Sequence, residues 1–259
     1  MIANKYDCFQ KCSSLTKCSL VSLNSNQCKL YNAINYTNFI SYTGSVCLYQ
    51  KYIEDYSSIN ANLAYYWPFN GNGNELISGA NIIGGSSYSY TTDRLNSPSS
   101  AIYVNNGYMQ MSAGYYINSD FTITAWVNPQ TYLLASNRRL LQFSTADGLD
   151  IVLIDIYVNI NFAIVNAGLQ RTLSTANQPC GKWYHLAVSL QGITGTIYIN
   201  GQVKTQGALY TVRNIIQTNA VFGSAGAGAG LTDAKFDDIK VFNRSLTQAE
   251  IIKVMNSYY

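Results

Sequence analysis

The chain has 259 residues, of which 47% are apolar and only 11% are charged, whereas an average soluble domain has about 25% charged residues. Its 16 basic and 13 acidic residues give a formal charge of +3, and the basic residues are scattered, with Arg138-Arg139 the one adjacent pair, which excludes a nucleic-acid-binding stripe. No apolar run approaches the ~20 residues that cross a bilayer, which excludes membrane insertion by a helix.

Five of the six cysteines lie within the first 47 residues, and the sixth is Cys180. Such a density in a short segment is typical of a disulfide framework and of an extracellular compartment. A zinc site is disfavoured, because paired C-x-x-C ligands are missing and the single histidine, His185, is remote in sequence. Residues 1–6 lack the apolar core of a signal peptide, which indicates a processed form, a fragment or a chain given without its leader.

The spacing of the first cysteines predicts a helix stapled to adjacent strands. Cys8 and Cys12 would share one face of a helical turn. Residues 19–24 alternate like a strand and are followed by turn residues and a further cysteine. A helix stapled to two adjacent strands would pair Cys8 with Cys28 and Cys12 with Cys18.

The N-terminal module, residues 1–50, carries an ordered set of cysteine motifs: Cys8-Phe-Gln-Lys-Cys12, Cys18, Cys28-Lys-Leu-Tyr31 and Val46-Cys47-Leu-Tyr49. Over residues 5–50 these motifs resemble a short PAN/apple domain, whose helix is bonded to a neighbouring strand pair in the way just described. The chain departs from that family because no cysteine precedes Cys8. The resemblance therefore assigns no partner to Cys47 or to Cys180. We expect a Cys47–Cys180 bridge between domains, which would contribute about 4–5 kcal/mol; the alternative is a missing N-terminal stretch that held the partner of Cys47.

The rest of the chain has the pattern of an all-β domain. Residues 51–61 are polar and without periodicity, which indicates a linker. From residue 62 to 259, short strand-like runs are separated by Gly, Asn and Ser, and residues 121–127 alternate with period two. Asn200-Gly201 is typical of a type I′ hairpin turn, and Thr247-Gln-Ala-Glu250 forms a capping box ahead of a short C-terminal helix. We predict a mainly β chain: an antiparallel β-sandwich or jelly roll after a small disulfide-stapled α+β module.

Six sequence segments of the second domain support this fold class. They are Leu63-Ala-Tyr-Tyr-Trp-Pro-Phe-Asn-Gly71, Ala101–Gly107, Phe121–Val127, Lys182–Val188, Ile197–Gly201 and Phe236–Ile251. In that order and spacing they resemble the laminin-G-like, concanavalin A-like jelly-roll superfamily over residues 62–255. The resemblance implies the fold and leaves function open, because the same sandwich hosts lectins, adhesion modules, spacers and hydrolases. It also implies that His185, in the Trp-x-His strand, is a packing and hydrogen-bonding residue.

A glycoside hydrolase on this fold would need a pair of catalytic carboxylates. Glycoside hydrolases on this sandwich resemble one another in a strand with the pattern Glu-x-Asp-x-x-Glu, whose carboxylates flank the scissile bond. This chain has three glutamates, and no two of them share a predicted strand: Glu54, Glu75 and Glu250. A loose set of aspartates is interpreted as a solvated loop and strand edge: Asp147, Asp150 and Asp155. We therefore predict no catalytic residues and no enzyme.

Calcium is the cofactor that the resemblance implies, held by loop carbonyls and carboxylates. Asp237 and Asp238 match the Asp-Asp of the family before the last strand, and Asp237 is expected on the inward face with Ile239 and Val241. Asn70 lies in the opening loop at a position where many relatives carry an aspartate. The loop therefore offers less negative charge to a cation. We expect a structural Ca²⁺ at Asp237, Asp238 and Asn70; the alternative is that Asp237 is a hydrogen-bonded structural residue.

Two further sequence features concern the surface. Asn35-Tyr-Thr and Asn243-Arg-Ser are N-glycosylation sequons. Residues 223–230 are rich in glycine, and because no Gly-Lys-Ser/Thr follows, they indicate a flexible loop and not a phosphate cradle.

Taken together, the sequence predicts a secreted or cell-surface structural or adhesive protein that acts through protein–protein contacts. Its partners would be other copies of itself or extracellular proteins, as in an extracellular assembly or filament. The low charge and the 22 tyrosines suit such interfaces. The alternative is a carbohydrate-binding lectin-type module with glycan partners, although all three tryptophans fall inside core phrases: Trp67, Trp126 and Trp183. A glycoside hydrolase is a remote third hypothesis.

Overall fold

A computed structural model describes the backbone of residues 20–24, 27–31, 47–50, 57–117, 119–131, 138–156, 159–177, 180–225 and 230–257. Side chains are described from Ile59 onward, apart from that of Asn177. The chain divides into two compact units, residues 1–58 with 256–259, and residues 59–255. Among the described residues, no helix has the length and the apolar character needed to span a membrane.

The N-terminal unit contains a three-stranded antiparallel sheet in the order β2-β1-β3, with β1 at Leu20–Asn24, β2 at Gln27–Tyr31 and β3 at Cys47–Gln50. Leu23 of β1 is in register with Cys28 on one side and with Cys47 on the other. The predicted helix and Cys8, Cys12 and Cys18 lie outside the described residues. The PAN/apple resemblance and the disulfides, the Cys47–Cys180 bridge included, therefore stay predictions.

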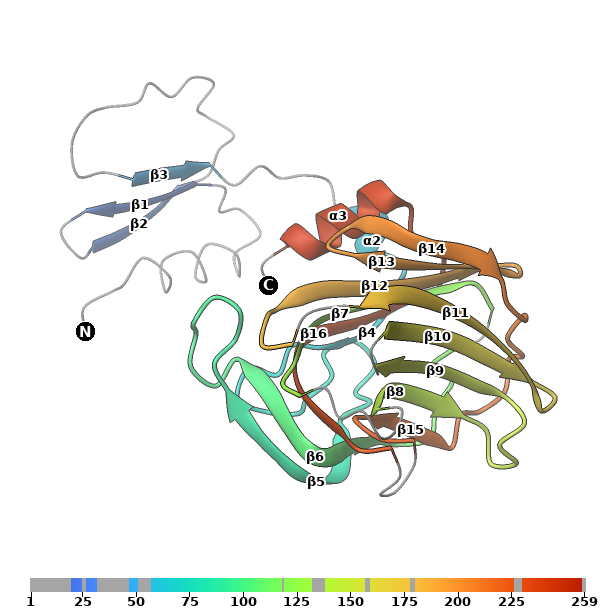
Figure 1. The fold of residues 1–259 in the computed structure, drawn as a ribbon. Helices are drawn as coiled ribbons and strands as arrows, with labels where there is room; N and C mark the ends of the chain where they lie inside the picture. The colour runs from blue at the N-terminus through green and yellow to red at the C-terminus, as the bar shows by residue number, and fades with distance from the viewer. Residues whose placement is uncertain are drawn as a thin grey trace. The chain divides into compact units, whose positions relative to one another are not determined.

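The second unit is built from thirteen strands that form one continuous antiparallel sheet. Their bounds are β4 Leu63–Trp67, β5 Ile82–Thr91, β6 Ala101–Met111, β7 Phe121–Pro129, β8 Arg138–Ser144, β9 Ile151–Ile156, β10 Asn159–Asn166, β11 Leu169–Asn177, β12 Tyr184–Gln191, β13 Thr194–Ile199, β14 Gln202–Ala208, β15 Asn219–Phe222 and β16 Thr232–Phe242. The spatial order is β11-β10-β9-β8-β15-β6-β16-β7-β12-β13-β14, and β4 and β5 pair with β16 and β6 (Figure 1).

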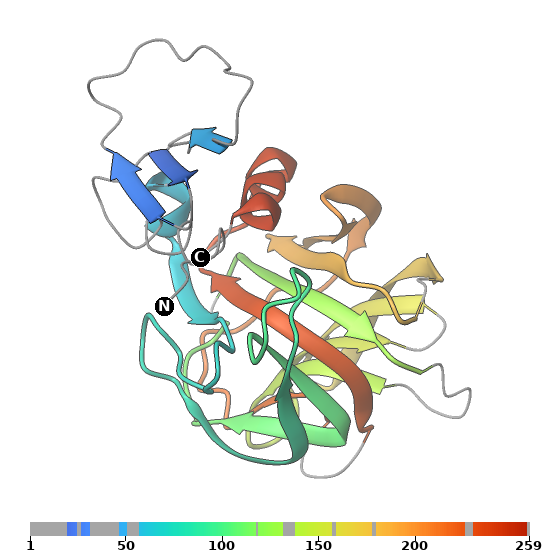
Figure 2. The same cartoon turned by 90° about the vertical axis from the view of Figure 1, so that its left-hand side faces the viewer.

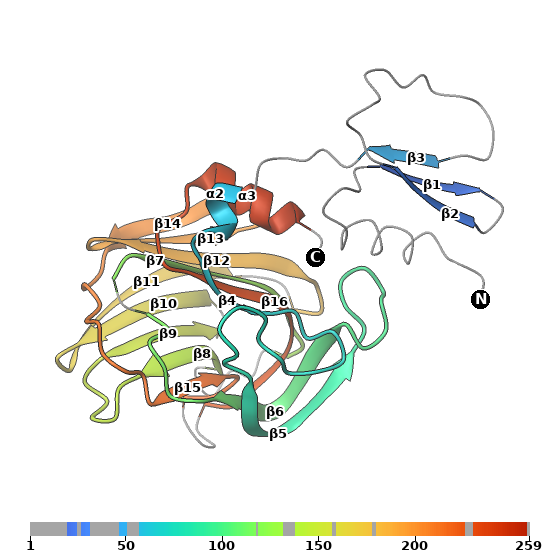
Figure 3. The same ribbon diagram turned by 180° about the vertical axis from the view of Figure 1, so that it is seen from behind.

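The sheet folds over on itself around one apolar core, as the views from three sides show (Figures 1–3). Alternate residues of β9 and β10, such as Ile154 and Phe162, belong to the core together with Ile123 of β7 and Val188 of β12. This period-two burial is what the sequence alternation predicted, and the antiparallel jelly roll is confirmed. The core is close-packed: the cavity lined by Ile123 and other apolar residues has a volume of about 20 Å³, room for about one water molecule.

The strands at the two ends of this spatial order, β11 and β14, lie beside each other. Thr205 Oγ1 donates to the carbonyl oxygen of Ser174 at 2.8 Å. A Cβ at Gly207 would lie 2.9 Å from Leu173 Cδ2, and one at Gly195 would lie 2.4 Å from Leu209 Cδ1. Both positions therefore favour glycine, because the approach of the leucines leaves no room for a side chain.

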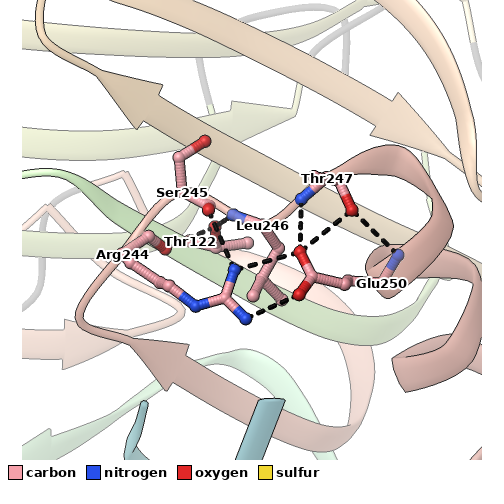
Figure 4. A network of polar contacts seen from close by, with 6 residues as sticks. All are labelled: Thr122, Arg244, Ser245, Leu246, Thr247 and Glu250. Carbon is pink, nitrogen blue, oxygen red and sulfur yellow. Dashed lines mark hydrogen bonds and ion pairs between the residues drawn. The ribbon is translucent and has the colours of Figure 1, made fainter. Parts of the chain in front are cut away.

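The predicted hairpin turn and capping box are both present. Asn200 and Gly201 have φ angles of +50° and +74°, as a type I′ turn requires. The helix α3 (Gln248–Asn256) begins after Thr247, whose amide donates to Glu250 Oε2 at 2.8 Å, while the Glu250 amide donates to Thr247 Oγ1 at 3.3 Å (Figure 4). Arg244 binds both oxygens of Glu250, at 2.6 and 3.0 Å, and with Thr247 this holds the pKa of Glu250 down at about 2.

A four-residue helix, α2 (Ser57–Asn60), falls in the segment predicted to be a linker. It contains Ile59, whose side chain is buried, and it leads directly into β4.

Candidate functional site

The strand β16 changes partner halfway along one edge. It pairs with β6 over Thr232–Phe236 and with β4 over Ile239–Phe242, while β7 accompanies it on the other edge. At the change, the register shifts between Asp237 and Lys240, and Asp238 has a φ angle of +51°. This is a β-bulge, the kind of irregularity that re-aims side chains.

The bulge corrects one expectation from the sequence. Phe236 and Ile239 both belong to the core, so the inserted residue changes the phase of the alternation. Asp237 is in register with Trp126, on the face opposite to Ile239. The prediction that Asp237 shares the face of Ile239 and Val241 is therefore wrong.

An arginine from a distant turn binds both carboxylates of the bulge. Arg94 donates to Asp237 and to Asp238, the latter at 2.9 Å from Nη2 to Oδ2, and its guanidinium lies 4.6 Å from the ring centre of Trp126. Tyr66 on β4 donates its hydroxyl to Asp238 Oδ1 at 2.5 Å. We call Arg94, Asp237, Asp238, Tyr66 and Trp126 the bulge cluster. The side chains of the arginine and the two aspartates are 9%, 4% and 11% exposed, so the ion pairs are buried.

The bulge cluster contains two carboxylates, and two cations interact with them, Arg94 and the buried Lys240. Burial and the neighbouring Asp238 raise the pKa of Asp237 to about 8, against the opposing effect of Arg94. This rise favours the protonated form of Asp237. Lys240 Nζ lies 4.8 Å from the ring centre of Tyr66, and burial lowers its pKa.

The predicted calcium set does not come together as a cation site. Asp237 and Asp238 are bound by Arg94, and Asn70 is exposed, with its carbonyl oxygen accepting from Asn72 Nδ2 at 3.3 Å. Within the described part of the chain, no group of three or more His, Cys, Asp or Glu side chains has a metal-binding arrangement. The residues present do not fit a Ca²⁺ ion at the two aspartates in this arrangement, and calcium stays a prediction.

His185 lies next to the bulge cluster and is fully buried. Its amide donates to Asn200 Oδ1 at 2.8 Å, and its ring meets Trp126 edge-on, with 5.4 Å between ring centres. Burial, followed by the charges of Lys240 and Arg94, lowers the pKa of His185 to about 3. The ring is therefore neutral at physiological pH, which matches the packing role expected for it.

The glutamates are engaged in holding loops. Glu75 accepts hydrogen bonds from the amides of Tyr66, Ile77, Ser78 and Gly79 at 2.6–2.9 Å, which shapes the loop that follows β4. Glu250 caps α3 as described above, and Glu54 lies outside the described residues.

The three aspartates that were interpreted as solvated differ from one another. Asp147 accepts from Thr145 Oγ1 at 2.6 Å in a loop, and Asp150 accepts from Arg213 Nε at 2.8 Å. Asp147 is exposed, whereas Asp150 is 8% exposed and Asp155, which lies in β9 between β8 and β10, is 4% exposed. The interpretation as solvated residues is therefore wrong for Asp150 and Asp155.

Asp155 belongs to a line of polar residues that crosses four adjacent strands. Arg139 of β8 is in register with Asp155 of β9, Asp155 with Asn161 of β10, and Asn161 with Ser174 of β11. Arg139 Nε donates to Asp155, and Ser174 Oγ donates to Asn161 Oδ1 at 2.6 Å. We call these four residues the polar row. They alternate with core residues along their strands, so the row lies on the outer face of the sheet.

The outer face beside the polar row has an apolar floor. Leu153 and Ala163 are the next outward residues on β9 and β10, and they are 4% and 0% exposed. Gln142 of β8 is in register with Leu153; it accepts from Arg139 Nη1 and donates to the carbonyl oxygen of Ala225 at 3.1 Å. Because Leu153 and Ala163 are covered, the accessible part of this face is the end of the polar row at Asn161 and Ser174.

The sequence reasoning missed the polar row, although one signal was available. A single aspartate inside the run Ile151-Val-Leu-Ile-Asp-Ile must find a partner when the strand is buried on both faces. Burial raises the pKa of Asp155, and Arg139 opposes that rise. The sequence did not reveal that Arg139, sixteen positions away, is the partner.

Of the remaining predicted features, Asn243 is exposed directly after β16, where a glycan could be attached. Asn35 lies outside the described residues. In the glycine-rich segment, the carbonyl oxygen of Gly223 accepts from the Thr232 amide at 2.9 Å, which closes the loop on itself; residues 226–229 are not described.

Solved structures with a similar fold come from carbohydrate-active and toxin proteins. Domain 4 of AbnA, a GH43 extracellular arabinanase from Geobacillus stearothermophilus solved with arabinotriose, matches with a TM-score of 0.59 and 16% identity, over 74% of this chain and 98% of that domain. The binding domain of Paraclostridial Mosquitocidal Protein 1 matches with a TM-score of 0.63 and 16% identity, over 77% of this chain and 53% of its own.

A botulinum neurotoxin type C structure, whose description concerns cell entry through two ganglioside molecules, matches with a TM-score of 0.60 and 14% identity, over 78% of this chain and 53% of that one. The chain thus spans about half the length of the toxin binding domains. At these identities the likeness establishes the fold alone.

Comparison with curated protein sequences gave no match. The family model described as "Concanavalin A-like lectin/glucanases superfamily" matches residues 104–252, which is more than half of the chain. Together with the jelly-roll topology, this match shows that the chain belongs to the concanavalin A-like lectin/glucanases superfamily.

Proposed function

We propose that residues 59–255 form a non-catalytic carbohydrate-binding module of a secreted or cell-surface protein. The observation that carries this proposal is the polar row, whose end at Asn161 and Ser174 is accessible to solvent. The fold neighbours support it, because one is a domain of an arabinanase in complex with arabinotriose and another is described with gangliosides.

The chemistry of the polar row suits a saccharide. Each sugar hydroxyl donates and accepts hydrogen bonds, and at the accessible end of the row the amide of Asn161 and the hydroxyl of Ser174 can do both. Neighbouring strands are about 4.8 Å apart, so consecutive polar groups fall within the span of one sugar ring. Because the four residues stand on paired strands, they are held rigidly.

The charge of the row indicates the class of sugar. Arg139 is paired with Asp155, so the row presents no net charge to a ligand. A neutral saccharide can exchange hydrogen bonds with both groups, whereas an acidic saccharide would have to compete with Asp155 for the guanidinium. We therefore favour neutral oligosaccharides as ligands.

The test is a glycan array followed by calorimetry with any neutral oligosaccharide that binds, using the full chain. Asn161→Ala removes a partly exposed amide of the row, and we expect about tenfold weaker binding from the loss of one to two hydrogen bonds. Arg213→Ala, which removes an arginine paired with Asp150 away from the row, is the matched control and should bind like the original chain. An array without hits would refute the function, and unchanged binding by Asn161→Ala would refute the site.

Protein–protein adhesion, the main reading of the sequence, is the second candidate. It is favoured by the exposed apolar residues Leu149 and Leu169, which are 44% and 65% exposed and flank Gly168, whose amide donates to the carbonyl oxygen of Leu149 at 3.0 Å. Exposed apolar neighbours of this kind mark interaction surfaces when they form larger patches. Electron microscopy and light scattering on non-reduced protein would detect ordered assemblies; a monomer at all concentrations would count against self-association.

A further inference from the structure

We propose that one end of the jelly roll is a surface on which two copies of this chain associate about a two-fold axis. Four exposed residues form this surface, and we call them the leucine patch: Asp147, Leu149, Leu169 and Arg171. In the pair, Asp147 of each copy lies opposite Arg171 of the other, and the leucines meet between them. This inference rests on the second candidate function, protein–protein adhesion, and it is independent of glycan binding.

The leucine patch lies where two connections of the sheet meet. The strands β8 to β11 follow one another as an antiparallel meander, so the β8–β9 loop and the β10–β11 turn are at the same end of the sheet (Figure 1). Gly168 joins the two connections: its amide donates to the carbonyl oxygen of Leu149 at 3.0 Å, and a Cβ at Gly168 would lie 3.6 Å from Leu149 Cδ2. Leu149 therefore lies against the turn that leads into Leu169.

The two charges of the leucine patch flank its leucines. On one side, the amide of Leu149 donates to Asp147 Oδ1 at 3.0 Å. On the other side, Arg171 follows Leu169 by two positions in β11, so these two side chains lie on the same face of the strand. The order across the surface is therefore acid, leucine, leucine, base. Such an order is complementary to itself after a half-turn, as an interface between two identical copies requires.

Both charges are held in place and are available to a partner. The Thr145 hydroxyl donates to Asp147 at 2.6 Å and lowers its pKa, so the carboxylate is ionised at neutral pH. Arg171 donates to the carbonyl oxygen of Leu209 at 3.3 Å, and its guanidinium lies 4.5 Å from the ring centre of Tyr210. Neither charge forms an ion pair with another residue that the structure describes. Arginine and tyrosine are residue types that are enriched at protein interfaces.

The pattern of charge favours a second copy over a partner of another kind. A surface with one sign of charge would fit a partner of the opposite sign, whereas the leucine patch carries one acid and one base, and the neighbouring Arg213–Asp150 pair is balanced. A copy of the chain offers the matching base and acid in the required order, and the symmetry makes each contact twice. The patch is small, so we expect a weak dimer that exchanges with the monomer.

The experiment reverses the charges in the full chain and measures association by analytical ultracentrifugation over a range of concentrations. Asp147→Lys places two cations opposite each other at both contacts, and Arg171→Glu places two anions there. Each variant alone should weaken the dimer by at least about tenfold, because like charges repel across an interface. A one-to-one mixture of the two variants should associate, because both contacts of the mixed pair join opposite charges. The double variant should dimerise like the original chain for the same reason.

Leu169→Asp should abolish the dimer. Its matched control is Val203→Asp, because Val203 is also exposed, at 46%, but lies next to the Asn200-Gly201 turn; this variant should associate like the original chain. A chain that stays monomeric at all concentrations refutes self-association altogether. A dimer that neither Leu169→Asp nor the charge reversals weaken refutes this surface and leaves adhesion through another one. Single variants that weaken the dimer but do not associate on mixing refute the two-fold arrangement, because the two residues would then act only within their own copy.

Discussion

Two clusters in the jelly roll pair an arginine with buried carboxylates, and they are used differently. In the bulge cluster, the arginine comes from a turn, its partners lie at an irregularity of β16, and Trp126 and Tyr66 enclose it. In the polar row, Arg139 and Asp155 are in register next to a shift in the β8–β9 pairing, and the line continues across the sheet through Asn161 to Ser174. The exposures of the two arginine side chains, 9% and 14%, are similar. The surroundings, and not burial alone, therefore separate a structural clamp from a surface that can meet a ligand.

The largest expected difference concerns stability. Arg94→Ala leaves Asp238 as a buried charge without its guanidinium, and we expect it to lower the free energy of unfolding by about 3–5 kcal/mol. Arg139→Ala should cost less, because it leaves a single carboxyl, that of Asp155, whose pKa burial already raises, so that this group can take up a proton. Urea denaturation of both variants measures the difference. Equal losses would remove the distinction between clamp and surface.

The next expected difference is in the pH dependence of stability. The pKa of Asp237 is raised to about 8 in the folded chain, so the folded chain binds this proton more tightly than the unfolded chain does. The stabilisation from this group is complete below its unfolded pKa of about 3.9 and is lost as the pH rises through about 8. Asp237→Asn should flatten this fall between pH values of about 5 and 9, as measured by Tm across that range. If the Tm of Asp237→Asn still falls with rising pH in the same way, Asp237 is not the cause of the pH dependence.

A smaller effect should separate binding from stability in the polar row. Ser174→Ala removes a hydroxyl that donates to Asn161 at 2.6 Å on an exposed part of the sheet. We expect a change in the free energy of unfolding of about 0.5–1.5 kcal/mol, together with weaker glycan binding, by calorimetry. The equivalent change in the bulge cluster, Tyr66→Phe, should alter stability and leave glycan affinity as it was. If Tyr66→Phe weakened glycan binding and Ser174→Ala changed only stability, the bulge cluster would be the binding site and the polar row the structural cluster.

The smallest effect is expected at the rim. In the Arg213–Asp150 pair the arginine side chain is 46% exposed and the aspartate side chain is 9% exposed. Solvent around the guanidinium screens the pair, and we expect Arg213→Ala to lower the free energy of unfolding by about 1 kcal/mol, the upper end for exposed pairs, and to leave glycan binding unaltered. A larger loss of the free energy of unfolding in urea denaturation would mean that burial of the ion pairs does not explain the contribution of the bulge cluster to stability.

Local patterns predicted the fold well, because they depend on neighbouring residues. The alternation at residues 121–127, the Asn200-Gly201 turn and the Thr247–Glu250 capping box all act within a few positions, and each is present in the structure. The clusters depend on distant partners instead. Asp237 could be recognised as a carboxylate that needs a partner, but Arg94 lies in a turn with no signal of its own, and the bulge that changes the phase of β16 leaves no mark in the alternation.

The meeting of β11 and β14 has a consequence for how copies of this chain can associate. An open sheet offers two unpaired edges on which another strand can be added, but here each end of the path lies against the other. The strand β5, which pairs with β6, has two register shifts, and Ser87 within it has a φ angle of +51°. Bulges of this kind twist an edge away from a flat template. Growth of fibres by adding strands at these edges of the second unit is therefore disfavoured, and an ordered assembly through this part of the chain would form through side-chain surfaces.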